Sequence, residues 1–148
     1  MVNIKVLNIL LVEDNPDHIE LITSELAESQ WIKGIQVTKD GQETLTFLRQ
    51  LAKSSRKKEA TCPSLILLDL NIPKINGFAI LHELKSDPHL KSIPVLVLTT
   101  STSQEDIEKA RELGANGYLV KSFYPPTLVE KMRKALSEEC FTFFSNFL

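Results

Sequence analysis

The sequence is poor in the residues that mark several common classes of protein. It contains two cysteines without a CxxC pair, and three histidines that are isolated from one another in the sequence. A disulfide framework or a structural zinc site is therefore not expected, and a reducing compartment is the simpler assumption. We expect the three histidines, His18, His82 and His89, to be ordinary surface or partly packed residues.

Long apolar runs and a strong net charge are also missing. No stretch is long or apolar enough to span a bilayer, and the first residues lack the layout of a signal peptide. The formal net charge of -2 argues against a dedicated surface for nucleic acid or anionic membranes. The basic cluster at 56–58 lies among polar residues and is interpreted as a solvated loop. We expect a cytoplasmic protein with neither a nucleic-acid nor a membrane partner.

Hydrophobic runs typical of strands alternate with amphipathic segments typical of helices. The expected strands cover residues 9–12, 35–38, 65–68, 94–98 and 117–120. Between them, apolar residues recur at helical spacing. Residues 52–63 are polar and are expected to form a loop. This order predicts one α/β domain, a (βα)5 three-layer sandwich with helices on both faces of a parallel sheet.

Charged or hydroxyl side chains follow four of the expected strands. Glu13 and Asp14 follow the first expected strand, Asp69 follows the third, Thr99 follows the fourth and Lys121 follows the fifth. Because the carboxyl ends of parallel strands meet at one edge of a sheet, these groups are expected to share a crevice. No glycine-rich phosphate loop follows the first strand, which disfavours binding of a nucleotide or a flavin.

With Tyr118 added, these positions fit together in a pattern that resembles the receiver domain of two-component response regulators. The resemblance covers about residues 9–136 and includes the spacings from Asp69 to Thr99 and from Thr99 to Lys121. It implies a flavodoxin-like fold with the sheet order 2-1-3-4-5.

The resemblance also implies a phosphoryl-accepting site. Asp69 would take a phosphoryl group from a phosphohistidine, and Lys121 would contact that group. Mg²⁺ would be held by Asp14 and Asp69, by Glu13 through water, and by the backbone carbonyl of Asn71. This role has a physical basis, because each pair of like charges repels by about 4 kcal/mol at about 4 Å for an effective dielectric constant of about 20. A divalent cation relieves that repulsion.

Two further roles follow from the same resemblance. Thr99 would bond a phosphoryl oxygen, and the ring of Tyr118 would then turn inward. These two movements together would form a conformational switch. Asn71 and Ser101 flank the crevice and would influence how fast the phosphate is lost.

Several local sequences resemble one subfamily, the small receivers that serve phytochrome-type histidine kinases in cyanobacteria. These sequences are DLNIP around Asp69, the extended loop before it, LTTS after the fourth strand, and Ser122 where receivers usually have proline. Proline at that position commonly accompanies a cis peptide bond, and the isomer of the Lys121–Ser122 bond stays open.

The expected organisation is a receiver domain at 5–137 followed by an apolar extension at 138–148. The fifth expected helix opens at residues 125–127 and continues to about 136, and the chain ends soon after it. We therefore expect a single-domain regulator whose surface is read by a phosphotransfer or effector protein. The extension contains Phe141, Phe143, Phe144 and Phe147. It would either cap the core or form a homodimer contact, and the fourth helix, fifth strand and fifth helix are the expected seam.

Two other functions fit parts of the pattern. A Mg²⁺-dependent phosphatase also uses an aspartyl phosphate, but such enzymes usually have a second aspartate where this chain has Asn71, so we expect no turnover enzyme. An interaction module that keeps the fold without the chemistry is the other alternative, and it is disfavoured because the acidic set is complete.

Overall fold

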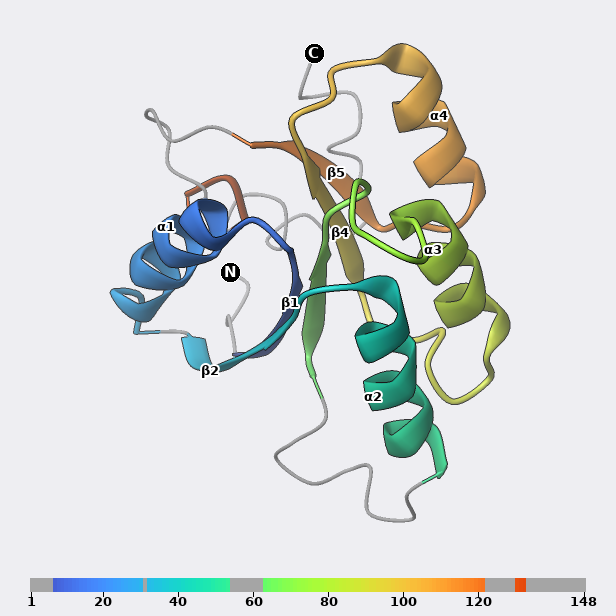
Figure 1. Ribbon diagram of the computed structural model, residues 1–148, viewed down its shortest axis with the longest axis horizontal. Coiled ribbons are helices and arrows are strands. Elements are labelled where there is room, and N and C mark those ends of the chain that lie inside the picture. Colours follow the sequence, from blue (N-terminus) through green and yellow to red (C-terminus); the bar gives the residue numbers. More distant parts are fainter. Residues whose placement is uncertain (1–6, 31, 54–62, 122–129, 133–148) are drawn as a thin grey trace, which may run out of the picture.

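Five strands alternate with helices in this computed structural model, which describes residues 7–30, 32–53, 63–121 and 130–132 (Figure 1). The elements are β1 (Leu7–Val12), α1 (Pro16–Ala27), β2 (Ile32–Thr38), α2 (Gly41–Lys53), β3 (Leu65–Leu68), α3 (Gly77–Ser86), β4 (Val95–Thr99), α4 (Gln104–Glu112) and β5 (Gly117–Val120). Residues 130–132 are also helical.

The strands form one parallel sheet in the order β2-β1-β3-β4-β5. Every residue of β3 and β4 is buried, as the dense aliphatic runs in their sequences predict. The predicted flavodoxin-like fold and its strand order are therefore confirmed.

Helices cover both faces of the sheet, with α1 on one face and α2, α3 and α4 on the other (Figure 1). Side chains of β1 alternate between the two faces. Leu10 and Val12 pack in the core beneath α2–α4, whereas Ile9 and Leu11 pack in the core beneath α1. The α1 core also contains Met132. This alternation gives the three layers that the sequence predicts.

Two helices that follow strands begin with side-chain caps at the same edge of the sheet. The side chain of Asn15 accepts hydrogen bonds from the amides of Asp17 and His18 at the start of α1. Ser103 caps α4 by accepting from the amide of Asp106. These caps fix where each helix begins, and so they fix which side chains of the first turn face the ends of the strands.

Some expectations fall outside the described residues. They are the middle of the 52–63 loop, the Lys121–Ser122 bond, most of the fifth helix and the apolar segment 138–148. Within the described ranges, no helix has the length and apolar character needed to cross a bilayer.

Candidate functional site

Five of the singled-out side chains come from the carboxyl ends of neighbouring strands. Glu13 and Asp14 directly follow β1, Asp69 directly follows β3, Thr99 is the last residue of β4, and Lys121 directly follows β5. Backbone bonds extend the sheet to these positions, since the amide of Asp69 donates to the carbonyl of Val12 at 3.0 Å. The strand order, rather than closeness in sequence, therefore assembles the site.

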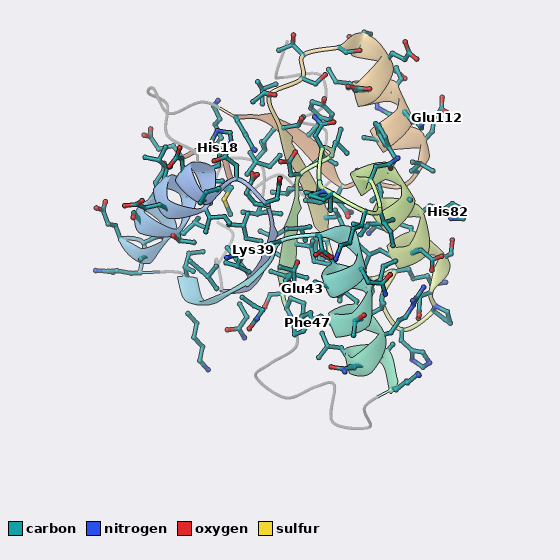
Figure 2. All side chains as sticks on the ribbon, in the orientation of Figure 1. His18, Lys39, Glu43, Phe47, His82 and Glu112 are labelled. Carbon is teal, nitrogen blue, oxygen red and sulfur yellow. The ribbon has the colours of Figure 1, made fainter. Side chains whose placement is uncertain are left out.

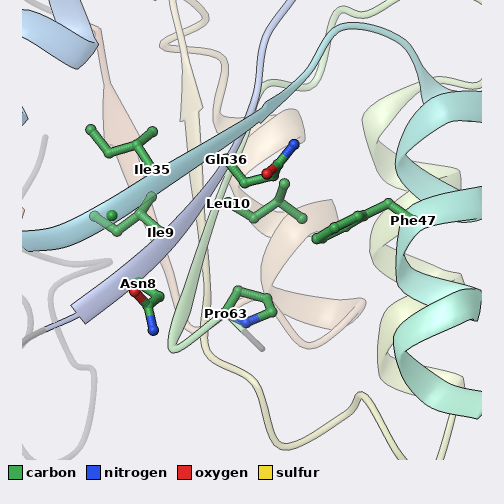
Figure 3. A pocket seen from close by; sticks show the side chains of 8 residues that line it. Asn8, Ile9, Leu10, Ile35, Gln36, Phe47 and Pro63 are labelled. Atoms are coloured by element: carbon green, nitrogen blue, oxygen red, sulfur yellow. The ribbon is translucent and has the colours of Figure 1, made fainter. Parts of the chain in front are cut away.

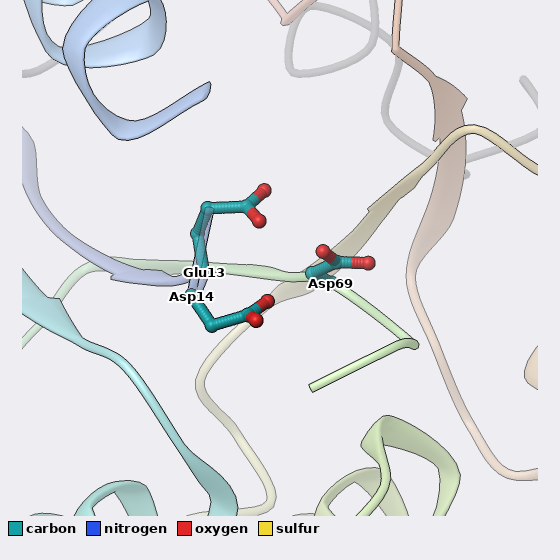
Figure 4. A group of neighbouring side chains, drawn as sticks. All are labelled: Glu13, Asp14 and Asp69. Carbon is teal, nitrogen blue, oxygen red and sulfur yellow. The ribbon is translucent and has the colours of Figure 1, made fainter. Parts of the chain in front are cut away.

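The three carboxylates form a cluster suited to a metal ion (Figure 4). Glu13, Asp14 and Asp69 each offer an oxygen, and these oxygens lie within 4.8 Å of one another. Glu13 and Asp69 are buried, whereas Asp14 is exposed. Carboxylate oxygens are the ligands that Mg²⁺ and other hard divalent cations prefer, so the donor set fits such an ion.

The ammonium group of Lys121 lies against the buried side of this cluster. Its Nζ donates to Oδ2 of Asp69 at 3.1 Å and forms an ion pair with Glu13. The Lys121 side chain is 4% exposed, so water screens these charges little. One positive charge thus faces three negative ones, and the described cluster keeps a net negative charge when all three acids are ionised.

Burial raises the pKa of Glu13 above its ordinary value, and the negative charge of Asp69 raises it further, while the bond to Lys121 acts in the opposite direction. Oε2 of Glu13 accepts from the amide of Asn15 at 3.2 Å. Oε1 has no hydrogen bond of good geometry within the described residues, although it pairs with the Lys121 ammonium. Holding this carboxylate ionised in the crevice therefore costs free energy that a divalent cation would offset.

A histidine that the sequence analysis set aside as isolated lies at the same place. Nδ1 of His18 is 2.9 Å from Nζ of Lys121 and 3.9 Å from Oε1 of Glu13. The residue lies in the first turn of α1, and Figure 2 labels it at the end of that helix nearest the ends of the strands. The sequence could have indicated that His18 lies at the site, because it stands four residues after Asp14. A residue one turn into a helix stays close to the end of the strand that precedes the helix.

Thr99 and Tyr118 lie on the neighbouring strands β4 and β5, and both are buried. Oγ1 of Thr99 accepts from the amide of Ser101 at 3.3 Å, and its carbonyl accepts from the amide of Lys121 at 2.7 Å. The hydroxyl of Tyr118 donates to the carbonyl of Ser101 at 3.0 Å. The Tyr118 ring is therefore buried and bonded to the β4–α4 loop, and its inward turn on phosphorylation stays a prediction.

Asn71 lies beside Asp69 and Ser101 lies beside Thr99, while their expected influence on the loss of phosphate stays a prediction. The amide of Asn71 donates to Oδ1 of Asp69 at 3.1 Å. The hydroxyl of Ser101 donates to Oδ2 of Asp106 at 2.7 Å, which links the β4–α4 loop to the first turn of α4. The contact between Asp106 and Ser101 was not predicted from the sequence.

A cavity of about 260 Å³ lies elsewhere, between β1, β2 and α2 (Figure 3). Its lining consists of Asn8, Ile9, Leu10, Gly34, Ile35, Gln36, Phe47 and Pro63. None of these lining residues is ionisable, and none belongs to the acidic cluster. Concave shape alone therefore does not mark the functional site of this chain.

Comparison with known proteins gives one consistent result. The family model described as the response regulator receiver domain matches residues 9–133. The chain is 41% identical over 114 residues to the response regulator Rcp1 of Synechocystis, covering 77% of this chain and 76% of that protein. It is 36% identical over 130 residues to a probable methanogenesis regulatory protein, FilR2 of Methanothrix harundinacea, covering 88% of this chain and 79% of that protein.

Solved structures agree with the sequence matches. The phosphorylated cyanobacterial phytochrome response regulator RcpA is 40% identical with a TM-score of 0.72, over 92% of this chain and 94% of that one. The Mn²⁺-bound form of Rcp1 is 36% identical with a TM-score of 0.72, over 92% and 96%. The bacteriophytochrome response regulator RtBRR is 36% identical with a TM-score of 0.71, over 89% and 76%.

Proposed function

The chain belongs to the response regulator receiver family, and we propose that a histidine kinase phosphorylates its Asp69. Members of this family are phosphoacceptor signalling modules rather than turnover enzymes. The observation that carries the proposal is the cluster of Glu13, Asp14 and Asp69 facing Lys121 at the carboxyl edge of the sheet.

The transfer exchanges one bond for another. A carboxylate oxygen of Asp69 forms an O–P bond while the P–N bond of the donor phosphohistidine breaks. The electron pair stays on the departing imidazole nitrogen, and that ring is neutral because its other nitrogen carries a proton. Contacts to the amide of Asn71 and to Lys121 hold the Asp69 carboxylate in place for this attack.

The metal we propose is Mg²⁺, held by Asp14, Asp69 and the carbonyl of Asn71, with Glu13 acting through water. When bound, the ion neutralises negative charge on the transferring phosphoryl group. The negative charge of the described cluster and the raised pKa of Glu13 support this assignment. A relative of this chain has been solved in a Mn²⁺-bound form, which agrees with a divalent cation at this edge.

Thr99 and Tyr118 are proposed to carry the response. The Thr99 hydroxyl would leave the amide of Ser101 to bond a phosphoryl oxygen, and the buried position of Tyr118 would then become favoured. Coupling of this kind is typically worth about 1–3 kcal/mol. Asn71 and Ser101 would flank the acyl phosphate and influence its lifetime.

The kinase is proposed to be a phytochrome, because several relatives are described as phytochrome response regulators. We further propose that residues 5–137 form the receiver and that 138–148 form an apolar extension that contributes to a homodimer. A phosphotransfer or effector protein would read the phosphorylated surface. Sedimentation at about 50 µM with and without phosphorylation tests the dimer, and a strict monomer in both states would exclude it.

Intact-mass analysis after incubation with Mg²⁺ and acetyl phosphate tests the central proposal. One added phosphate is expected, dependent on Mg²⁺ and lost in Asp69→Asn. If no adduct forms, the stable phosphoryl mimic beryllofluoride separates two explanations. Binding of beryllofluoride would indicate that the aspartyl phosphate forms and is hydrolysed very fast. Failure to bind beryllofluoride as well would indicate an interaction module without phosphoryl chemistry.

A further inference from the structure

The Lys121 ammonium is surrounded by three acceptors from three different elements. Oδ2 of Asp69 lies at 3.1 Å after β3, Nδ1 of His18 lies at 2.9 Å on α1, and Glu13 forms an ion pair after β1. An ammonium group has three protons and no lone pair, so it donates to His18 and Asp69 while its positive charge pairs with Glu13.

The direction of the contact with His18 follows from the same chemistry. Because Lys121 can only donate, Nδ1 of His18 accepts and the ring proton lies on Nε2. The cap of α1 fixes the backbone that carries the ring, since the amide of His18 donates to the side chain of Asn15 at 3.2 Å. The imidazole is 25% exposed and the ammonium is 4% exposed. The ring therefore lies at the rim of the site, next to an ammonium that water barely reaches.

We propose that His18 is a positioning residue for Lys121, which rests on the proposed function of Asp69. When the phosphoryl group joins Asp69, the ammonium has to turn from the carboxylate toward a phosphoryl oxygen. The bond to His18 involves no atom of Asp69, so it persists through that change. His18 thus limits the ammonium to a small rotation and keeps one proton directed at the reacting group.

Two substitutions separate this role from simple packing. His18→Leu keeps a side chain of similar size but removes the acceptor. His18→Asn is smaller, and its Oδ1 can replace Nδ1 as the acceptor. With acetyl phosphate and saturating Mg²⁺ at about pH 8, we expect phosphorylation of His18→Leu to slow by about five- to tenfold, as for loss of one hydrogen bond of ordinary net strength. His18→Asn should recover most of the rate.

A double-mutant cycle tests whether His18 acts through Lys121. In a Lys121→Met background no ammonium is left to orient, so adding His18→Leu should change the residual rate by less than about twofold. An equal loss in both backgrounds would overturn the proposal. His82→Leu serves as a control, because His82 is exposed on α3 away from the site and should leave the rate unchanged (Figure 2).

A spectroscopic measurement keeps this inference separate from the proposed function. The buried Lys121 ammonium, held by two hydrogen bonds and an ion pair, should give a slowly exchanging ¹⁵N–¹H signal, assigned by its loss in Lys121→Met. We expect the signal to disappear in His18→Leu and to persist in His18→Asn, without any phosphorylation. A signal that survives in His18→Leu would overturn the positioning role. Absence of phosphorylation in the unmodified protein, with this signal pattern intact, would overturn the proposed function alone.

Discussion

The hydroxyl of Tyr118 donates a 3.0 Å hydrogen bond to the backbone carbonyl of Ser101. Ser101 in turn donates from its own hydroxyl to Asp106, so one loop residue connects β5 with the first turn of α4. The amide of the same residue donates to Thr99. A change in the bonding of Thr99 therefore reaches α4 through a single residue, which gives the proposed switch a short physical route.

Tyr118 should give the protein a measurable alkaline instability. Burial, aided by the charge of Asp106 and opposed by the bond to Ser101, raises the pKa of Tyr118 above its ordinary value. As pH rises past about 10, the unfolded chain ionises first while the folded chain keeps its proton, so the free energy of unfolding falls. Urea unfolding should show this slope above about pH 10 in the unmodified protein, and Tyr118→Phe should show a smaller one. Parallel pH curves would contradict the prediction.

Gly77→Ala and Gly34→Ala should change stability in opposite directions. A Cβ on Gly77 would lie 2.6 Å from the carbonyl oxygen of Asp69, so the backbone that carries the phosphoacceptor has to move. We expect a loss of about 1–3 kcal/mol and slower phosphorylation. At Gly34 the nearest atom is the Asn8 Oδ1 at 3.4 Å, and alanine should stabilise by about 0.5 kcal/mol. Urea denaturation of both variants checks the contrast.

Removing one carboxylate from the cluster should stabilise the metal-free protein and abolish its response to Mg²⁺. Asp14→Asn relieves repulsion by Glu13 and Asp69, and because Asp14 is exposed we expect a gain of about 0.5–1 kcal/mol in EDTA. Mg²⁺ at about 100 times its dissociation constant should stabilise the unmodified protein by about 2.7 kcal/mol. Thermal unfolding with and without Mg²⁺ measures both effects. If Mg²⁺ stabilises the variant as much as the unmodified protein, Asp14 is not a ligand of the metal.

Lys85→Met should lower stability without affecting phosphorylation. The Lys85 ammonium donates to the carbonyls of Lys91 and Ile93 and to the side chain of Asn116, at 3.0–3.1 Å, on the edge of the sheet opposite the acids. Loss of these bonds should cost about 2–3 kcal/mol. Lys91→Met is a matched control because its side chain is exposed, and it should change stability by less than about 0.5 kcal/mol. A comparable loss in both variants would show that the bonds of Lys85 contribute nothing specific.

The acidic cluster was predictable because its members are fixed by the strands they follow. Once parallel strands are assigned, Glu13, Asp14 and Asp69 have to lie at one edge, whatever the loops do. The strand order that makes β1 and β3 neighbours came from the family resemblance, since alternation along the chain is compatible with several orders.

Contacts that depend on the phase of a helix or on a rotamer were not predictable. His18 reaches Lys121 only because the Asn15 cap sets where α1 begins, and the sequence separation of 103 residues gives no hint of the pair. Lys85 donates to backbone carbonyls, and the sequence does not indicate such partners because every residue has a carbonyl group. Strand β2 starts at Ile32 rather than at the predicted 35, because pairing with β1 continues past a register irregularity.

Two adjacent residues of β5 belong to the two different hydrophobic cores of the protein. Tyr118 packs in the core beneath α2–α4, and Leu119 packs in the core beneath α1. Because the sheet lies between these cores, substitutions in one should be nearly additive with substitutions in the other. Either core can therefore be repacked without disturbing the other, and the strand-end carboxylates belong to neither of them.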